Sequence, residues 1–74
     1  MNTLRTPLYE VTVTMAPKSG IADRNFLIRT TLGKFDARKV GAGHLGILNL
    51  NSDATIGYTL NGVEAFVNAE VVNE

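Results

Sequence analysis

The chain has 74 residues, of which 45% are hydrophobic and 19% are charged, and its seven basic and seven acidic side chains leave no net charge. This length and composition predict one small globular domain over residues 1–74 and exclude a disordered chain. The absence of cysteine excludes disulfides and thiolate metal sites, and a single histidine excludes a histidine-rich metal centre within one subunit. We therefore expect no metal and no cofactor, and self-association as the remaining way to stabilise so small a core.

The sequence also lacks the signals of membrane insertion and secretion. No stretch approaches the roughly 20 apolar residues of a membrane span. The first seven residues lack the apolar centre of a signal peptide. We expect no contact with a membrane and a cytoplasmic location, with which the lack of cysteine is compatible.

Two strands are predicted in the first half of the chain. Residues 8–15 alternate between apolar and polar side chains and are rich in β-branched residues, which is typical of a strand. Residues 16–24 contain proline, serine, glycine and aspartate and predict a loop. Residues 25–32 predict a second strand, which carries apolar side chains on both of its faces.

The middle of the chain is harder to assign. Residues 34–40 fit either a short third strand or a single helical turn at 35–40, and we favour the strand. Residues 41–46 predict a glycine-rich loop, residues 47–50 a short strand, and residues 51–53 a tight turn.

The last twenty residues predict a β-hairpin. Asn61-Gly62 stands between two alternating segments and is the strongest local signal for a two-residue turn, because both turn residues need positive φ. This turn predicts a register in which Leu60 faces Val63, Tyr58 faces Ala65, Ile56 faces Val67 and Ala54 faces Ala69, all on the buried side.

These segments together predict an all-β or β-rich fold. We expect a small antiparallel meander, barrel or sandwich of five or six short strands that ends in the Asn-Gly hairpin.

Charge is segregated along the sequence. Residues 1–39 hold seven basic and three acidic side chains, a balance of +4, whereas residues 40–74 hold four acidic side chains and no basic one. One interpretation is that the two halves pack together with their charges paired or solvated. Another is that a basic surface of one copy meets an acidic surface of another. A third interpretation is a basic patch that binds an anionic ligand.

Residues 41–46 match the pattern G-x-G-x-x-G, which binds phosphates when it joins a strand to a helix. The segment that follows is too short for that helix, so the sequence favours a plain connection between strands. The alternative is a small-anion or nucleotide site made by loop N–H groups and neighbouring side chains. Its candidate residues are Arg29, Arg38, Lys39, Gly41, Gly43 and His44.

Binding of single-stranded nucleic acid needs a basic groove and aromatic platforms. Its candidates are Arg24, Arg29, Arg38 and Lys39 with Phe26, Phe35 or Tyr9. The neutral net charge disfavours this function. An enzyme is also disfavoured, because His44 has no identifiable nucleophile and Glu64 and Glu70 are six positions apart.

Self-association is the leading hypothesis. Apolar side chains occur on predicted polar faces, and the last strand has no proline or lysine to protect a free edge. The predicted interface residues are Leu27, Glu64, Phe66, Glu70 and Val72. We expect a non-enzymatic, homo-oligomeric module that acts through protein–protein contacts, with itself or with a protein partner. A phage or mobile-element accessory protein is one source that fits.

Overall fold

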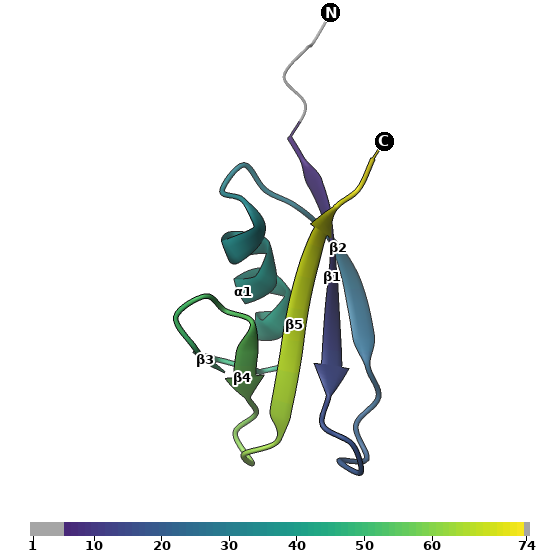
Figure 1. Cartoon of the computed structure of the whole chain (residues 1–74), viewed down its shortest axis with the longest axis vertical. Coiled ribbons are helices and arrows are strands. Elements are labelled where there is room, and N and C mark those ends of the chain that lie inside the picture. The colour runs from purple at the N-terminus through teal and green to yellow at the C-terminus, as the bar shows by residue number, and fades with distance from the viewer. Residues whose placement is uncertain (1–5, 74) are drawn as a thin grey trace, which may run out of the picture.

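A computed structural model describes residues 6–73 as one antiparallel sheet with a helix on one face (Figure 1). The elements are β1 (Leu8–Met15), β2 (Arg24–Arg29), α1 (Lys34–His44), β3 (Asn49–Leu50), β4 (Ile56–Tyr58) and β5 (Glu64–Val71). The strand order is β2-β1-β5-β4-β3. The β-rich prediction is confirmed, and its barrel alternative is wrong because the sheet stays open.

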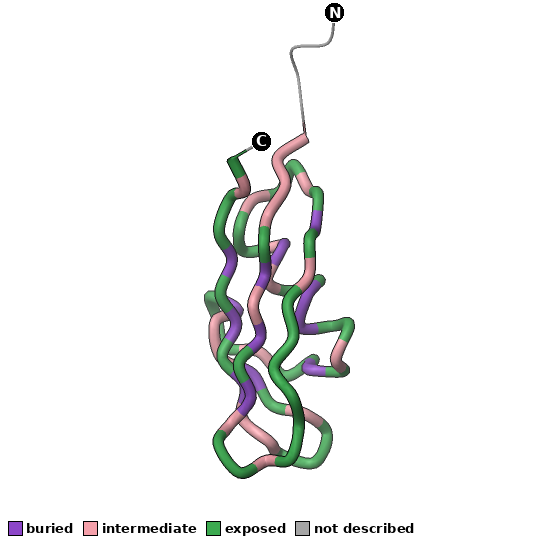
Figure 2. Tube along the Cα trace, turned by 90° about the vertical axis from the view of Figure 1, so that its right-hand side faces the viewer, coloured by how far each residue is buried: buried purple, intermediate pink, exposed green. Residues whose placement is uncertain are grey.

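Strand β1 runs through the middle of the core, and its predicted alternation of inward and outward side chains is confirmed. Val11 and Val13 have no exposed surface, and Met15 is also buried. Strand β5 pairs along β1 and adds Ala65, Val67 and Ala69 to the same side. Along the strands, buried segments of the chain alternate with more exposed ones (Figure 2). The side chains between these positions point to the other face of the sheet, as the period of two requires.

The prediction of a strand at residues 34–40 and a loop from residue 41 is wrong, because residues 34–44 form α1. Only residues 45 and 46 of the predicted loop follow the helix. The alternative of a helical turn at 35–40 lies within this helix. The buried residues of α1 are Ala37, Gly41 and Ala42, at a spacing that lies on one side of a helix. Because this side consists of small residues, it lacks the large apolar side chains by which helical periodicity is recognised.

The small residues of α1 permit close contact with the sheet. A Cβ atom at Gly41 would lie 2.5 Å from Val11 Cγ1 and 3.1 Å from Val11 Cβ. The backbone of α1 therefore approaches β1 more closely than any larger residue would allow.

The C-terminal hairpin is present, but its predicted register is wrong by one residue. Ile56 pairs with Phe66, Gly57 with Ala65 and Tyr58 with Glu64. The turn has three residues rather than two, since Thr59 N–H donates to Val63 O at 3.0 Å and Gly62 has φ of +81°.

This shift reverses the faces of β4. Gly57 is buried toward the core, whereas Tyr58 is exposed and Leu60, in the turn, is 96% exposed. The one-residue shift does not change the inward face of β5, because the alternation of apolar and polar side chains within β5 determines that face.

The edge of the sheet also differs from the prediction. Strand β5 was expected to present a free edge, but it lies inside the sheet between β1 and β4. The outer strand beside β1 is β2. Among residues 6–73, no helix is long and apolar enough to cross a membrane.

We expect Gly41→Ala to lower the free energy of unfolding by about 1–2 kcal/mol. The overpacking cost of roughly 1–3 kcal/mol exceeds the gain of about 1 kcal/mol in helix propensity. Gly43→Ala is the matched control, because no atom lies within 4 Å of a Cβ there, and it should raise stability. Urea unfolding measures both changes, and equal stabilisation by the two variants would contradict the close contact.

Candidate functional site

One face of the sheet has no covering element among the described residues, because α1 packs on the opposite face (Figure 1). We call this uncovered surface the open face. Alternation along the strands and their registers assign its side chains. They are Leu8, Glu10, Thr12, Thr14, Asn25, Leu27, Arg29, Ile56, Tyr58, Glu64, Phe66, Asn68 and Glu70.

Apolar side chains interrupt the polar surface of the open face. Leu27 on β2 is 67% exposed, and Phe66 on β5 is 45% exposed. Phe66 is paired with Ile56 on one side and Thr14 on the other, so these three side chains form a row across three strands. The open face therefore offers apolar contacts at its centre and at its outer strand.

Three carboxylates also lie on the open face, and each accepts a hydrogen bond from a neighbouring side chain. Asn25 Nδ2 donates to Glu10 Oε2 at 3.1 Å. The Tyr58 hydroxyl donates to Glu64 Oε2 at 3.3 Å, and Asn68 Nδ2 donates to the carboxylate of Glu70 at 3.4 Å. Since Arg29 is the one base among the residues of this face, its formal charge is −2.

The structure brings most of the predicted interface residues together. Leu27, Glu64, Phe66 and Glu70 all lie on the open face. Val72 follows β5, is half-buried, and donates its N–H to Leu8 O at 2.7 Å. Their role in an interface stays a prediction. Sequence reasoning placed Ile56 and Tyr58 in the core instead of here, because of the error in the hairpin register.

The residues proposed for an anion site do not form a loop. Gly41, Gly43 and His44 lie in the last turns of α1, where the carbonyl oxygens of Ala42 and Gly43 accept N–H groups from the following residues. This end of a helix carries the negative end of the dipole, which disfavours anions. The predicted nest of loop N–H groups is thus wrong, and ligand binding by these residues stays a prediction.

The basic candidates are separated in space. Arg38 Nε donates to Asp53 O at 3.1 Å, and Lys39 Nζ lies 5.5 Å from the centre of the Phe35 ring. Arg29 lies on the open face, on the other side of the sheet from α1, where its Nη1 donates to Thr6 O at 3.0 Å.

An aromatic stack joins the end of α1 to β2. The rings of Phe26 and His44 lie 5.0 Å apart at 28°. Arg24 Cζ lies 5.7 Å from the centre of the Phe26 ring. Phe26 is half-buried, so the stack closes the core at this edge of the sheet.

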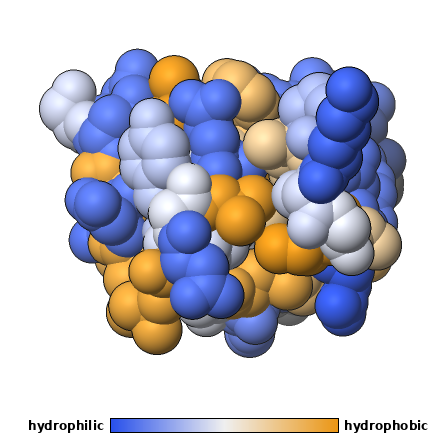
Figure 3. All heavy atoms as spheres, turned by 90° about the horizontal axis from the view of Figure 1, so that it is seen from below, coloured by the Kyte–Doolittle hydropathy of each residue, from blue (hydrophilic) through white to orange (hydrophobic). Residues whose placement is uncertain are grey.

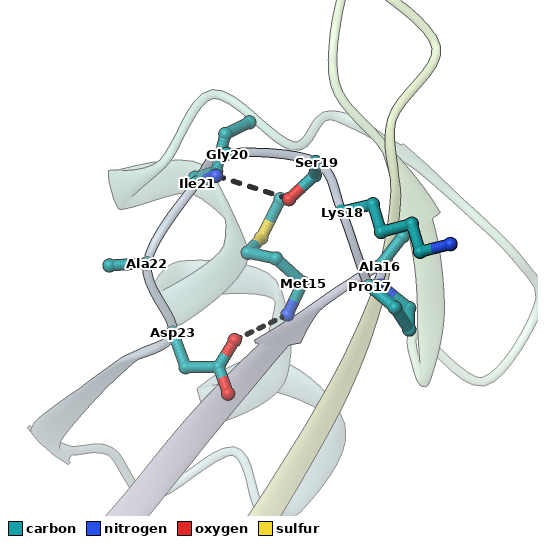
Figure 4. A pocket seen from close by; sticks show the side chains of 9 residues that line it. All are labelled: Met15, Ala16, Pro17, Lys18, Ser19, Gly20, Ile21, Ala22 and Asp23. Carbon is teal, nitrogen blue, oxygen red and sulfur yellow. Dashed lines mark hydrogen bonds between the residues drawn. The ribbon is translucent and has the colours of Figure 1, made fainter.

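Two shallow hollows lie near the lower end of the molecule in Figure 1. The loop between β1 and β2 encloses about 480 Å³ (Figure 4), and there Asp23 Oδ1 accepts the Met15 N–H at 2.9 Å. Another of about 400 Å³ lies between Gly46, Leu48 and the hairpin residues Tyr58–Leu60. Viewed from this end, apolar and hydrophilic surfaces are interleaved (Figure 3). Both hollows are open and hold no cluster of charged groups.

Within residues 6–73, no group of three or more acidic or histidine side chains is placed to hold a metal ion. Comparison of the chain with models of known protein families, with curated proteins and with solved structures finds no match. Function is therefore inferred from the chemistry of the residues themselves.

A hydrogen bond within the loop before β4 lowers the proton affinity of Asp53. The Thr55 hydroxyl donates to Asp53 Oδ1 at 2.6 Å. This hydrogen bond holds the pKa of Asp53 below its ordinary value, and the Arg38 guanidinium adds a smaller attraction. The main-chain oxygen of Asp53 accepts a hydrogen bond from Arg38 Nε and so joins the loop before β4 to α1.

We expect Phe66→Ser to be tolerated and Val67→Ser to be strongly destabilising. Phe66 points to the open face, so its loss should cost less than about 1 kcal/mol, whereas Val67 is 3% exposed and its loss should cost more than about 2 kcal/mol. The two residues are adjacent in β5, which makes them a matched pair for chemical unfolding. Equal costs would mean that the open face is covered.

We also expect Asp53→Asn to destabilise the protein at neutral pH more than in acid. A lowered folded-state pKa contributes stability above the unfolded value of about 4, and this contribution is lost as pH falls through the folded pKa. Unfolding curves at about pH 7, 4 and 2.5 should therefore converge for wild type and variant as pH falls. A difference that grows in acid would contradict this assignment.

Proposed function

We propose that this protein is a non-enzymatic, homo-oligomeric binding or assembly module that acts through protein–protein contacts in the cytoplasm. The single observation that carries the proposal of a binding module is the open face, and the composition of the core is what supports self-association. A sheet face that meets only water normally carries polar side chains, whereas Leu27, Ile56 and Phe66 interrupt this pattern.

The composition of the core supports self-association. Four of the fully buried hydrophobic side chains are alanines, at positions 37, 42, 54 and 65, and the largest fully buried ones are Ile47, Val11 and Val13. A core of such small side chains removes little apolar surface from water. Contact with a second copy would remove more apolar surface from water, and self-association is a usual way to stabilise a domain of this size.

The charge of the open face sets the chemistry of a further protein partner. Glu64 lies next to Phe66 on the same side of β5, and Glu10 and Glu70 lie in the cross-strand row of Leu27. The three carboxylates are held in place by neighbouring amide and phenol groups. Two such faces packed directly on each other would bring carboxylates together, which is unfavourable. A partner for this face should instead present apolar and basic groups, so the copies are expected to join elsewhere on the sheet.

We expect the wild-type protein to self-associate at micromolar concentration. Light scattering or sedimentation should show a mass of at least twice the 8.0 kDa of one chain, and the mass should fall on dilution. A mass of 8.0 kDa at every concentration up to about 200 µM would contradict the homo-oligomeric function.

A further inference from the structure

Strand β2 is the longer of the two outer strands of the sheet, the other being the two-residue β3. The hydrogen-bonding pattern shows which main-chain groups of β2 point outward. Val72 N–H donates to Leu8 O and Ala16 N–H donates to Glu64 O, so even-numbered residues of β1 bond to β5. The odd-numbered residues of β1 therefore bond to β2, at Arg24, Phe26 and Ile28.

The remaining residues of β2 direct their N–H and C=O groups away from β1. Asn25 and Leu27 are two of these, and both are exposed. Within the described residues no strand lies beyond β2 (Figure 1). These outward groups form a template to which another strand can add.

The usual protections of such an edge are absent from β2. The strand contains no proline and no lysine, and its one exposed apolar side chain, Leu27, lies in the outer half of the open face. Its two charged residues, Arg24 and Arg29, are at its ends and leave the centre uncharged.

We propose that β2 pairs with β2 of a second copy, antiparallel and about a two-fold axis that passes through Phe26. This contact rests on the self-association proposed above and specifies its geometry. In this register Asn25 lies opposite Leu27 of the second copy, and Leu27 lies opposite Asn25 of the second copy. Since all four of these residues direct main-chain groups outward, they exchange four hydrogen bonds.

Side chains favour this register over one centred on Leu27. With the axis at Phe26, the two Phe26 rings are cross-strand neighbours on the α1 side, an arrangement that stabilises antiparallel pairs. If the register continues one residue beyond β2, Arg29 lies opposite Asp23 of the second copy, a residue of opposite charge whose Oδ1 accepts the Met15 N–H of its own chain. An axis at Leu27 would place Arg29 opposite Asn25 instead.

The pairing gives one sheet that runs through both copies. Both α1 helices lie on the same side, because the two-fold axis is perpendicular to the sheet, and the two open faces join into one acidic surface with apolar centres. This arrangement keeps the carboxylates of the two copies side by side rather than face to face.

Leu27→Pro tests the contact. Proline at this position removes an N–H that points away from β1, so the β1–β2 ladder keeps its hydrogen bonds. We expect the dimer dissociation constant to rise at least about a hundredfold. Leu27→Ala is the matched control, because it shortens the side chain but keeps the N–H, and it should weaken the dimer far less.

Single-cysteine variants test the register, since the chain has no cysteine of its own. Phe26→Cys should form a disulfide-linked dimer on oxidation, because the two sulfurs meet at the axis. Leu27→Cys should not, because its copies are offset along the strand beyond disulfide reach. This pair also decides the contact if Leu27→Pro fails to fold by circular dichroism.

The outcomes separate the two proposals. A monomeric wild type overturns the homo-oligomeric function and the β2 contact with it. A wild type and a folded Leu27→Pro variant that associate equally overturn the β2 contact but keep self-association. Cross-linking of Leu27→Cys without Phe26→Cys overturns the register.

Discussion

The contact between Gly41 of α1 and Val11 of β1 is the constraint on which the arrangement depends. Val11 lies in the strand that joins both halves of the sheet, and it has no exposed surface. The helix covers it only because no side chain at residue 41 stands between the two backbones. Ala37 and Ala42 also place small side chains on this side of α1, so the helix lies close over β1 and β5.

One short helix covers one face of a five-stranded sheet, and the other face is left to water or to partners. The segregation of charge along the sequence becomes a difference between these two sides. Lys34, Arg38 and Lys39 lie on α1, whereas Glu10, Glu64 and Glu70 lie on the open face. The molecule is neutral overall but polarised across its thickness, which favours contacts in defined orientations over random association.

Part of the candidate site was predictable from the period of a strand alone. Leu27 and Phe66 were expected on outward faces, and each lies on the open face, because alternation within one strand is a local property. The anion-site candidates failed as a group because their spacing was interpreted as a loop. Within α1 the same residues point in several directions, and Arg29 lies on the far side of the sheet.

Local sequence patterns were enough to predict β1 to the residue, the inward face of β5, and the presence of a turn near Asn61-Gly62. These follow from side-chain alternation and from the backbone freedom of glycine, which act over a few residues. The helix at 34–44, the faces of β4 and the position of β2 at an edge of the sheet could not be predicted from such patterns. Each of these depends on contacts between distant segments: the close approach to Val11, the burial of Gly57 against Ile47 and Leu50, and the pairing of β5 with β1.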